Sequence, residues 1–93
     1  HMERYKEFIR EIEYLVKDDE KNTEETVSDD GRPCFVIPVN KHITAEQIAM
    51  MDKMVDNFSD VVARDDFIFE TVDDPDVSMN RKMIANFYIT MKS

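Results

Sequence analysis

Residues 82–92 carry the pattern that most restricts the fold of this chain, because their side chains alternate between apolar and polar as on a β-strand. The two sets are Met83, Ala85, Phe87, Ile89 and Met91 against Ile84, Asn86, Tyr88, Thr90 and Lys92. Residues 67–72 form a second apolar stretch of strand length, which a Pro-containing acidic run follows. The two segments predict an antiparallel hairpin, in a register that brings Phe67 opposite Phe87.

Two other segments repeat their apolar residues at three- and four-residue spacing, which is typical of amphipathic helices. The first covers residues 3–19, and its apolar stripe consists of Tyr5, Phe8, Ile9, Ile12, Leu15 and Val16. The second begins after Thr44, which forms a capping-box pattern with Gln47. Its spacing allows an end near Asn57 or an extension to Ala63.

The stretch between the two helices predicts one further strand and a weaker one before it. Residues 34–39 read Cys-Phe-Val-Ile-Pro-Val, a strand in which Pro38 indicates a sheet edge or a strand end. The turn signal Asp30-Gly31 could close a hairpin with a strand at residues 24–28. Otherwise residues 18–32 form a mobile acidic loop.

These elements predict an α+β fold in the order α-(β)-β-α-β-β. We expect a small, mainly antiparallel sheet of three or four strands, packed with two helices. A parallel pairing of strands 34–39 and 67–72 would make the second helix a right-handed crossover between them. No repeat or linker divides the 93 residues, so we expect a single domain over residues 2–93, with His1 left over from cloning.

The residue types exclude several common kinds of catalytic site. With Gly31 as the only glycine, the chain can form no P-loop, no dinucleotide-binding turn and no nucleophile elbow. Cys34 is the only cysteine, and the predicted strand separates it from His42. The acidic run at residues 73–76 lacks the calcium-loop pattern. We therefore predict no catalytic residues, no metal site and no cofactor.

The charge balance bears on the choice of partner. The chain has 12 Lys and Arg residues against 21 Asp and Glu residues, a net charge of −9. Such a surface repels phosphate backbones, so direct nucleic-acid binding is not expected. The acidity either only keeps the protein soluble or attracts a basic partner. No apolar run is long enough to span a membrane, and a cytoplasmic location fits the single cysteine.

Three groups of residues are candidates for contact with a partner. The acidic group consists of Asp18, Asp19, Glu20, Glu24, Glu25, Asp29 and Asp30. Met50 and Met54 lie on the shoulder of the second helix, where they either fill the core or form an adaptable binding surface. The third group is the second sheet face, with Ile68, Val72, Ile84 and Tyr88. That face is too apolar to be freely solvated, so either one helix covers each side or this face meets another molecule.

The sequence favours a non-enzymatic protein-interaction module, such as an inhibitor, an antitoxin-like or immunity-like protein, or an adaptor. Its partner would be a protein, basic in charge, or a second copy bound through the apolar sheet face. The alternative is a nucleic-acid mimic, whose carboxylates would occupy the phosphate sites of a DNA- or RNA-binding enzyme. A third hypothesis is a small enzyme that uses Tyr14 or Tyr88 with a carboxylate.

Overall fold

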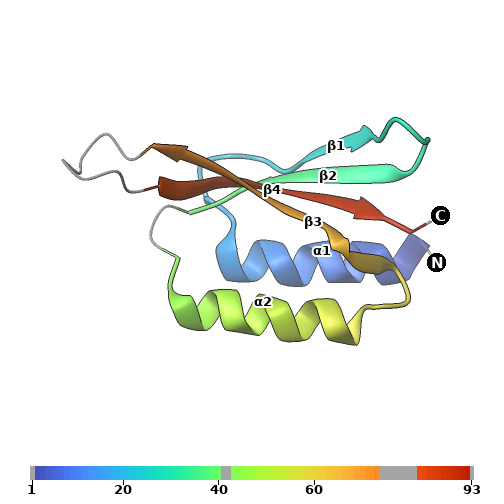
Figure 1. Ribbon diagram of the computed structural model, residues 1–93, viewed down its shortest axis with the longest axis horizontal. Coiled ribbons are helices and arrows are strands. Elements are labelled where there is room, and N and C mark those ends of the chain that lie inside the picture. Colours follow the sequence, from blue (N-terminus) through green and yellow to red (C-terminus); the bar gives the residue numbers. More distant parts are fainter. Residues whose placement is uncertain (1, 41–42, 74–81, 93) are drawn as a thin grey trace.

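The computed structural model describes residues 2–40, 43–73 and 82–92. The elements are α1 (Met2–Val16), β1 (Glu24–Val27), β2 (Pro33–Pro38), α2 (Ala45–Asn57), β3 (Val62–Asp73) and β4 (Lys82–Met91). The four strands form one sheet in the order β1-β2-β4-β3, and every neighbouring pair is antiparallel. Both helices lie on the same side of this sheet (Figure 1). The α+β prediction and its element order are confirmed.

The two helices bury the stripes that their spacing predicts. In α1, Phe8 and Ile12 are completely buried. In α2, Thr44 is the N-cap, and both hydrogen bonds of the capping box with Gln47 are present. The helix ends at Asn57 rather than Ala63 because Phe58 is already the C-cap residue and the chain turns there.

The β1–β2 hairpin is present, with Glu24 opposite Val36 and Val27 opposite Pro33. Gly31 has a φ of +83°, a left-handed conformation that suits glycine, and its turn joins the two strands. Pro38 is the last residue of β2, and β2 lies inside the sheet. The prediction of a strand end at Pro38 is therefore confirmed, and that of an edge is wrong.

The parallel pairing of residues 34–39 with 67–72 is wrong, because β4 lies between β2 and β3. The register within the β3–β4 hairpin also differs from the prediction. Phe67 faces Ile89, and Phe69 faces Phe87. The pairing is irregular between Val62 and Phe67 and again after Glu70.

The second irregularity changes the side of the sheet on which one predicted residue lies. Glu70 pairs with Asn86, but the next β3 residue, Thr71, pairs with Ile84, so Ala85 is an extra residue in β4. Ile84 is therefore on the same side as Phe69 and packs against the core. The prediction that Ile84 lies on the second sheet face is wrong, because a bulge reverses the alternation.

One hydrophobic core fills the space between the helices and the sheet. Its completely buried side chains come from both helices and three strands and include Phe8, Ile12, Ile37, Phe87, Ile89 and Met91. The rings of Phe67 and Phe69 lie 5.3 and 4.6 Å from that of Phe87. The core therefore lies against one face of the sheet, the face that the two helices cover.

Candidate functional site

The sheet face opposite the helices, called the open face below, is the first candidate site. No helix of the described chain covers it (Figure 1). The register places on it Glu24 and Thr26 from β1, Cys34, Val36 and Pro38 from β2, Ile68, Glu70 and Val72 from β3, and Asn86, Tyr88 and Thr90 from β4. The sequence left open an arrangement with one helix on each side of the sheet. That arrangement is wrong, because both helices lie on the same side.

Exposed apolar side chains stand at the β3 side of the open face. Ile68 is 56% exposed and Val72 is 39% exposed, and both lie where the alternation predicts. Tyr88 lies directly opposite Ile68 on the neighbouring strand and is half-buried. Single exposed apolar residues are ordinary, but here three of the predicted residues share one uncovered face.

A hydrogen-bonded network lies at the centre of the open face. Glu70 accepts a hydrogen bond of 2.8 Å from the Asn86 side-chain amide and one of 2.9 Å from the Tyr88 hydroxyl. Both bonds favour the ionised carboxylate, Asn86 more than Tyr88, and hold the pKa of Glu70 below its ordinary value. The Glu70 carboxylate in turn raises the pKa of Tyr88. At neutral pH the pair is therefore a carboxylate and a neutral phenol.

A pocket of about 530 Å³ opens beside this network. Tyr88 and Asn86 line it together with Val36 and Pro38, and Lys21, Asn22 and Glu24 complete its wall. The segment that carries Lys21 is held against the end of β2, because the Asp18 amide donates a 2.9 Å hydrogen bond to the Pro38 carbonyl. The volume lies in the range of ligand pockets, roughly 300–1,000 Å³.

The acidic group does not form one surface. Asp18, Asp19 and Glu20 follow α1, and Glu24 lies on the pocket wall. Glu25 lies instead in a cleft with side chains of α1, on the helix side of the sheet. Asp29 and Asp30 are at the far end of the hairpin, in the turn that contains Gly31. The candidate acidic residues, which are close in sequence, are therefore separated by the fold into three places.

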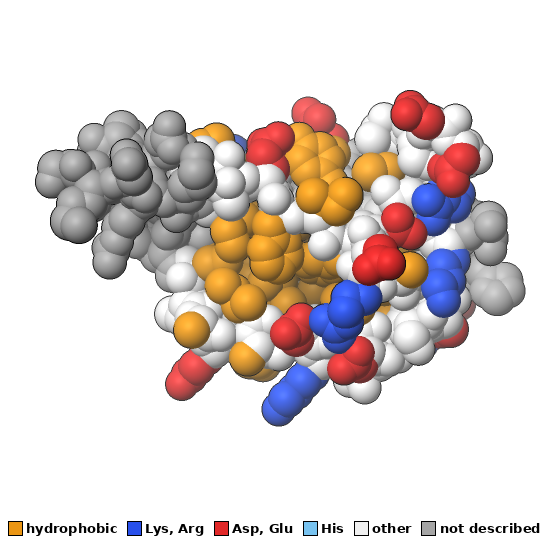
Figure 2. Space-filling view, viewed as in Figure 1, with side chains coloured by type: hydrophobic (Ala, Val, Ile, Leu, Met, Phe, Trp, Pro, Cys, Tyr) orange, Lys and Arg blue, Asp and Glu red, His pale blue; other side chains and the backbone are white. Residues whose placement is uncertain are grey.

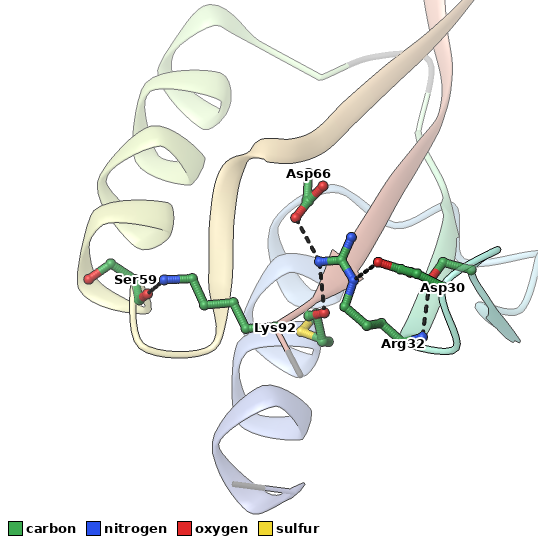
Figure 3. Close-up of polar contacts among 7 residues, drawn as sticks. Asp30, Arg32, Ser59, Asp66 and Lys92 are labelled. Atoms are coloured by element: carbon green, nitrogen blue, oxygen red, sulfur yellow. Dashed lines mark hydrogen bonds and ion pairs between the residues drawn. The ribbon is translucent and has the colours of Figure 1, made fainter.

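Arg32 neutralises part of the acidity at the hairpin turn. Its guanidinium contacts the Asp30 carboxylate at 2.7 Å and the Asp66 carboxylate at 3.0 Å, and donates to the Met91 carbonyl (Figure 3). The hydrogen bond from the Ser28 hydroxyl, and after it the contact with Arg32, lower the pKa of Asp30. The Arg32 side chain thus fastens the β1–β2 turn to β3 and the end of β4.

The second candidate surface is a groove between α2 and β3, called the edge groove below. Its apolar lining consists of Ile48, Met51, Val55, Phe67 and Phe69. Hydrophobic side chains gather in a hollow between the sheet edge and α2, with charged side chains beside it (Figure 2). At about 70 Å³ the cavity is small, and Phe67 in its wall packs against the core.

The two methionines of α2 differ in their surroundings. Met50 is 49% exposed, whereas Met54 is half-buried and packs against the core. Core filling therefore accounts for Met54, and Met50 alone keeps the exposure that a binding residue needs. Tyr14, the other tyrosine named for a scattered enzyme site, is 92% exposed on α1, on the opposite side of the sheet from Tyr88.

Other kinds of site find little support in the part of the chain that the structure describes. There, no group of three or more His, Cys, Asp or Glu side chains could hold a metal ion. Cys34 is buried on the open face, while His42 and residues 74–76 lie outside the described residues. Neither helix has the length and apolar character needed to span a membrane.

Sequence reasoning missed Glu70 and Asn86. The available signal was that both fall on the same predicted strand face as Tyr88, which is an unusual place for a carboxylate between apolar neighbours. Comparison of the chain with protein-family models, curated proteins and solved structures gave no match.

Proposed function

We propose that this protein is a non-enzymatic binding module that holds a basic partner protein against its open face. The observation that carries the proposal is the exposure of Ile68 and Val72 on a sheet face without a covering helix, around an ordered carboxylate. Antiparallel sheets that face water usually present polar side chains there. An apolar area with a polar centre is instead typical of a protein interface.

The chemistry of the Glu70–Tyr88 pair supports binding rather than catalysis. Acid–base catalysis works best when the pKa of the catalytic group lies near the working pH. Here the carboxyl pKa is lowered and the phenol pKa is raised, so both move away from neutrality. The pair is thus suited to fixing a charge in place and poorly suited to moving a proton.

Charge complementarity points to a basic partner. The chain carries a net charge of −9, and the Glu70 and Glu24 carboxylates belong to the open face itself. Opposite charges across an interface steer encounter and select partners. A nucleic-acid mimic would need its carboxylates in one row, and the separation of Glu25, Asp29 and Asp30 from Glu24 gives that alternative less support.

Co-purification with a matched pair of variants would test the proposal. Ile68→Ser removes an exposed apolar side chain from the open face, and Val27→Ser removes one, 65% exposed, from the other side of the sheet. We expect native-lysate proteins that bind the unaltered protein to be lost with Ile68→Ser and retained with Val27→Ser. Equal retention by both variants would contradict the proposal.

Light scattering on the purified protein addresses the self-association hypothesis. We expect a monomer, since the proposed partner of the open face is a different, basic protein. A dimer that dissociates with Ile68→Ser would replace the proposed partner by a second copy of this chain. If the captured protein is displaced by DNA and its affinity falls steeply as salt rises, the nucleic-acid mimic would be favoured instead.

A further inference from the structure

The pocket on the open face lies beside an anion, the Glu70 carboxylate, which has no cation partner in the described chain and is held by two residues of the pocket wall, Asn86 and Tyr88. Glu70 accepts hydrogen bonds from two neutral donors, Asn86 and Tyr88, and forms no ion pair within the described residues. By contrast, Asp60, Asp66 and the Asp52–Asp56 pair each bind an arginine. An ionised carboxylate has about four acceptor sites, so Glu70 retains unused ones.

The walls of the pocket suit a long cationic side chain. Val36 and Pro38 supply apolar surface for an aliphatic stem, and Tyr88 supplies an aromatic ring. Glu24 adds a second carboxylate, whereas Lys21 is the one cation among the described residues of the wall and is itself exposed. The balance of these charges with Glu70 is negative, which disfavours an anionic ligand.

We infer that this pocket receives an arginine side chain of the partner protein, whose guanidinium binds the Glu70 carboxylate beside Tyr88. Arginine fits better than lysine because its planar, weakly hydrated head can stack on a ring and donate to a carboxylate at once. The inference rests on the proposed function, since it names the partner group that the open face recognises. It also makes a prediction that needs no partner.

The test uses N-acetyl-arginine methylamide as the probe, titrated into the whole protein and followed by NMR. We expect saturable shifts at the Asn86 side-chain amide and at Tyr88, with weak affinity because the probe is small. The neutral analogue N-acetyl-citrulline methylamide has nearly the same shape and should give no saturable shift. Equal binding of both probes, or shifts spread over the acidic surface without saturation at the pocket, would overturn the inference.

Variants that change one charge test the inference most directly, through the affinity for the arginine probe. Glu70→Gln should weaken probe binding by about tenfold, because hydrogen bonds to a charged group are stronger than those to a neutral one. Lys21→Gln should strengthen binding by roughly twofold, since it removes a repulsive but exposed charge. Glu46→Gln, at an exposed position of α2, is the matched control and should change nothing.

The two proposals fail separately. If the arginine probe binds with this charge signature but no protein depends on Ile68, the pocket assignment stands and the proposed function fails. If a protein does depend on Ile68 but the probe binds no better than citrulline, the arginine inference fails alone. Lys21→Gln keeps the test valid even if Glu70→Gln disturbs folding, because Lys21 is exposed. If Lys21→Gln leaves the affinity for the probe unchanged, the inference is contradicted.

Discussion

Two neutral donors hold the Glu70 carboxylate on the open face, and one of them can be removed cleanly. In Tyr88→Phe, Glu70 loses the 2.9 Å hydrogen bond from the phenol and keeps the one from Asn86. We expect its pKa to rise from the lowered value toward the ordinary one, while staying below it. A carbon-detected NMR titration of the Glu70 carboxyl would measure the change.

The hydrogen bond from the Tyr88 hydroxyl to Glu70 also predicts the direction in which stability changes with pH. Because the pKa of Glu70 is lowered by folding, its contribution is present above the unfolded-state pKa and is lost as pH falls through the folded one. Tyr88→Phe should therefore reduce the loss of stability on acidification. Tyr14→Phe is the control, since that tyrosine is 92% exposed, and an equal effect of both variants would refute the assignment.

At the scale of single residues, alternation predicted which side of the sheet Ile68 and Tyr88 occupy but not that of Ile84. The difference lies in the extra residue at Ala85, because every position beyond a bulge changes side. No turn residue or proline marks that bulge in the sequence. Glu70 was missed for another reason: its importance depends on two donors from a different strand.

Among the elements, the β1–β2 hairpin depends on the left-handed conformation of Gly31. A Cβ atom at that position would meet nothing within 4 Å, so any cost of Gly31→Ala comes from the backbone at φ +83°. We expect Gly31→Ala to lower the free energy of unfolding by about 1 kcal/mol. Urea denaturation at neutral pH would measure it.

Gly31→Asn separates backbone strain from the loss of flexibility. Asparagine enters the left-handed region more readily than alanine does, so this variant should be less destabilised. If alanine and asparagine cost the same, the conformation of Gly31 would not be the cause.

The start of α2 depends on the capping box. The Thr44 hydroxyl accepts a hydrogen bond of 3.2 Å from the Gln47 amide, and the Gln47 side chain binds both the Thr44 amide and the Leu15 carbonyl. We expect Thr44→Ala to lower the free energy of unfolding by about 1 kcal/mol. Thr44→Ser, which retains the hydroxyl, should lie close to the unaltered protein in the same denaturation experiment, and a loss as large as that of alanine would exclude the cap as the cause.

The helices and the β2 and β4 strands were predictable because each carries its own period. The end of α1 was not: the helix stops at Val16 rather than at residue 19, because Lys17 already pairs with Val39. The first part of β3 was not, since residues 62–66 contain three charged residues and no alternation. Tertiary contacts place these residues in the strand. Val62 is buried opposite Met91, and Arg32 binds Asp66, so contacts with distant segments decide the conformation.

For the whole molecule, the arrangement of layers explains why a single core and an uncovered face coexist. Both helices are needed on one side to bury Phe8, Phe87 and their neighbours, and nothing in the described chain remains to cover the other side. The alternation alone could not tell which side each helix takes. That choice follows from the connections, which return the chain to the same side after β2 and before β3.

The net charge of the whole molecule predicts how salt affects its stability. Local pairs such as Arg64 with Asp52 and Asp56 attract, but 21 acidic residues against 12 basic ones leave a general repulsion that is stronger in the compact state. Salt screens both, and because the pairs are exposed they contribute little. We therefore expect urea denaturation at neutral pH to show greater stability in 0.2 M than in 0.01 M NaCl, by up to about 1 kcal/mol. Repeating the measurement near the isoelectric point of about 4.5 should abolish the gain, and a fall in stability with salt at neutral pH would mean that the arginine pairs outweigh the repulsion.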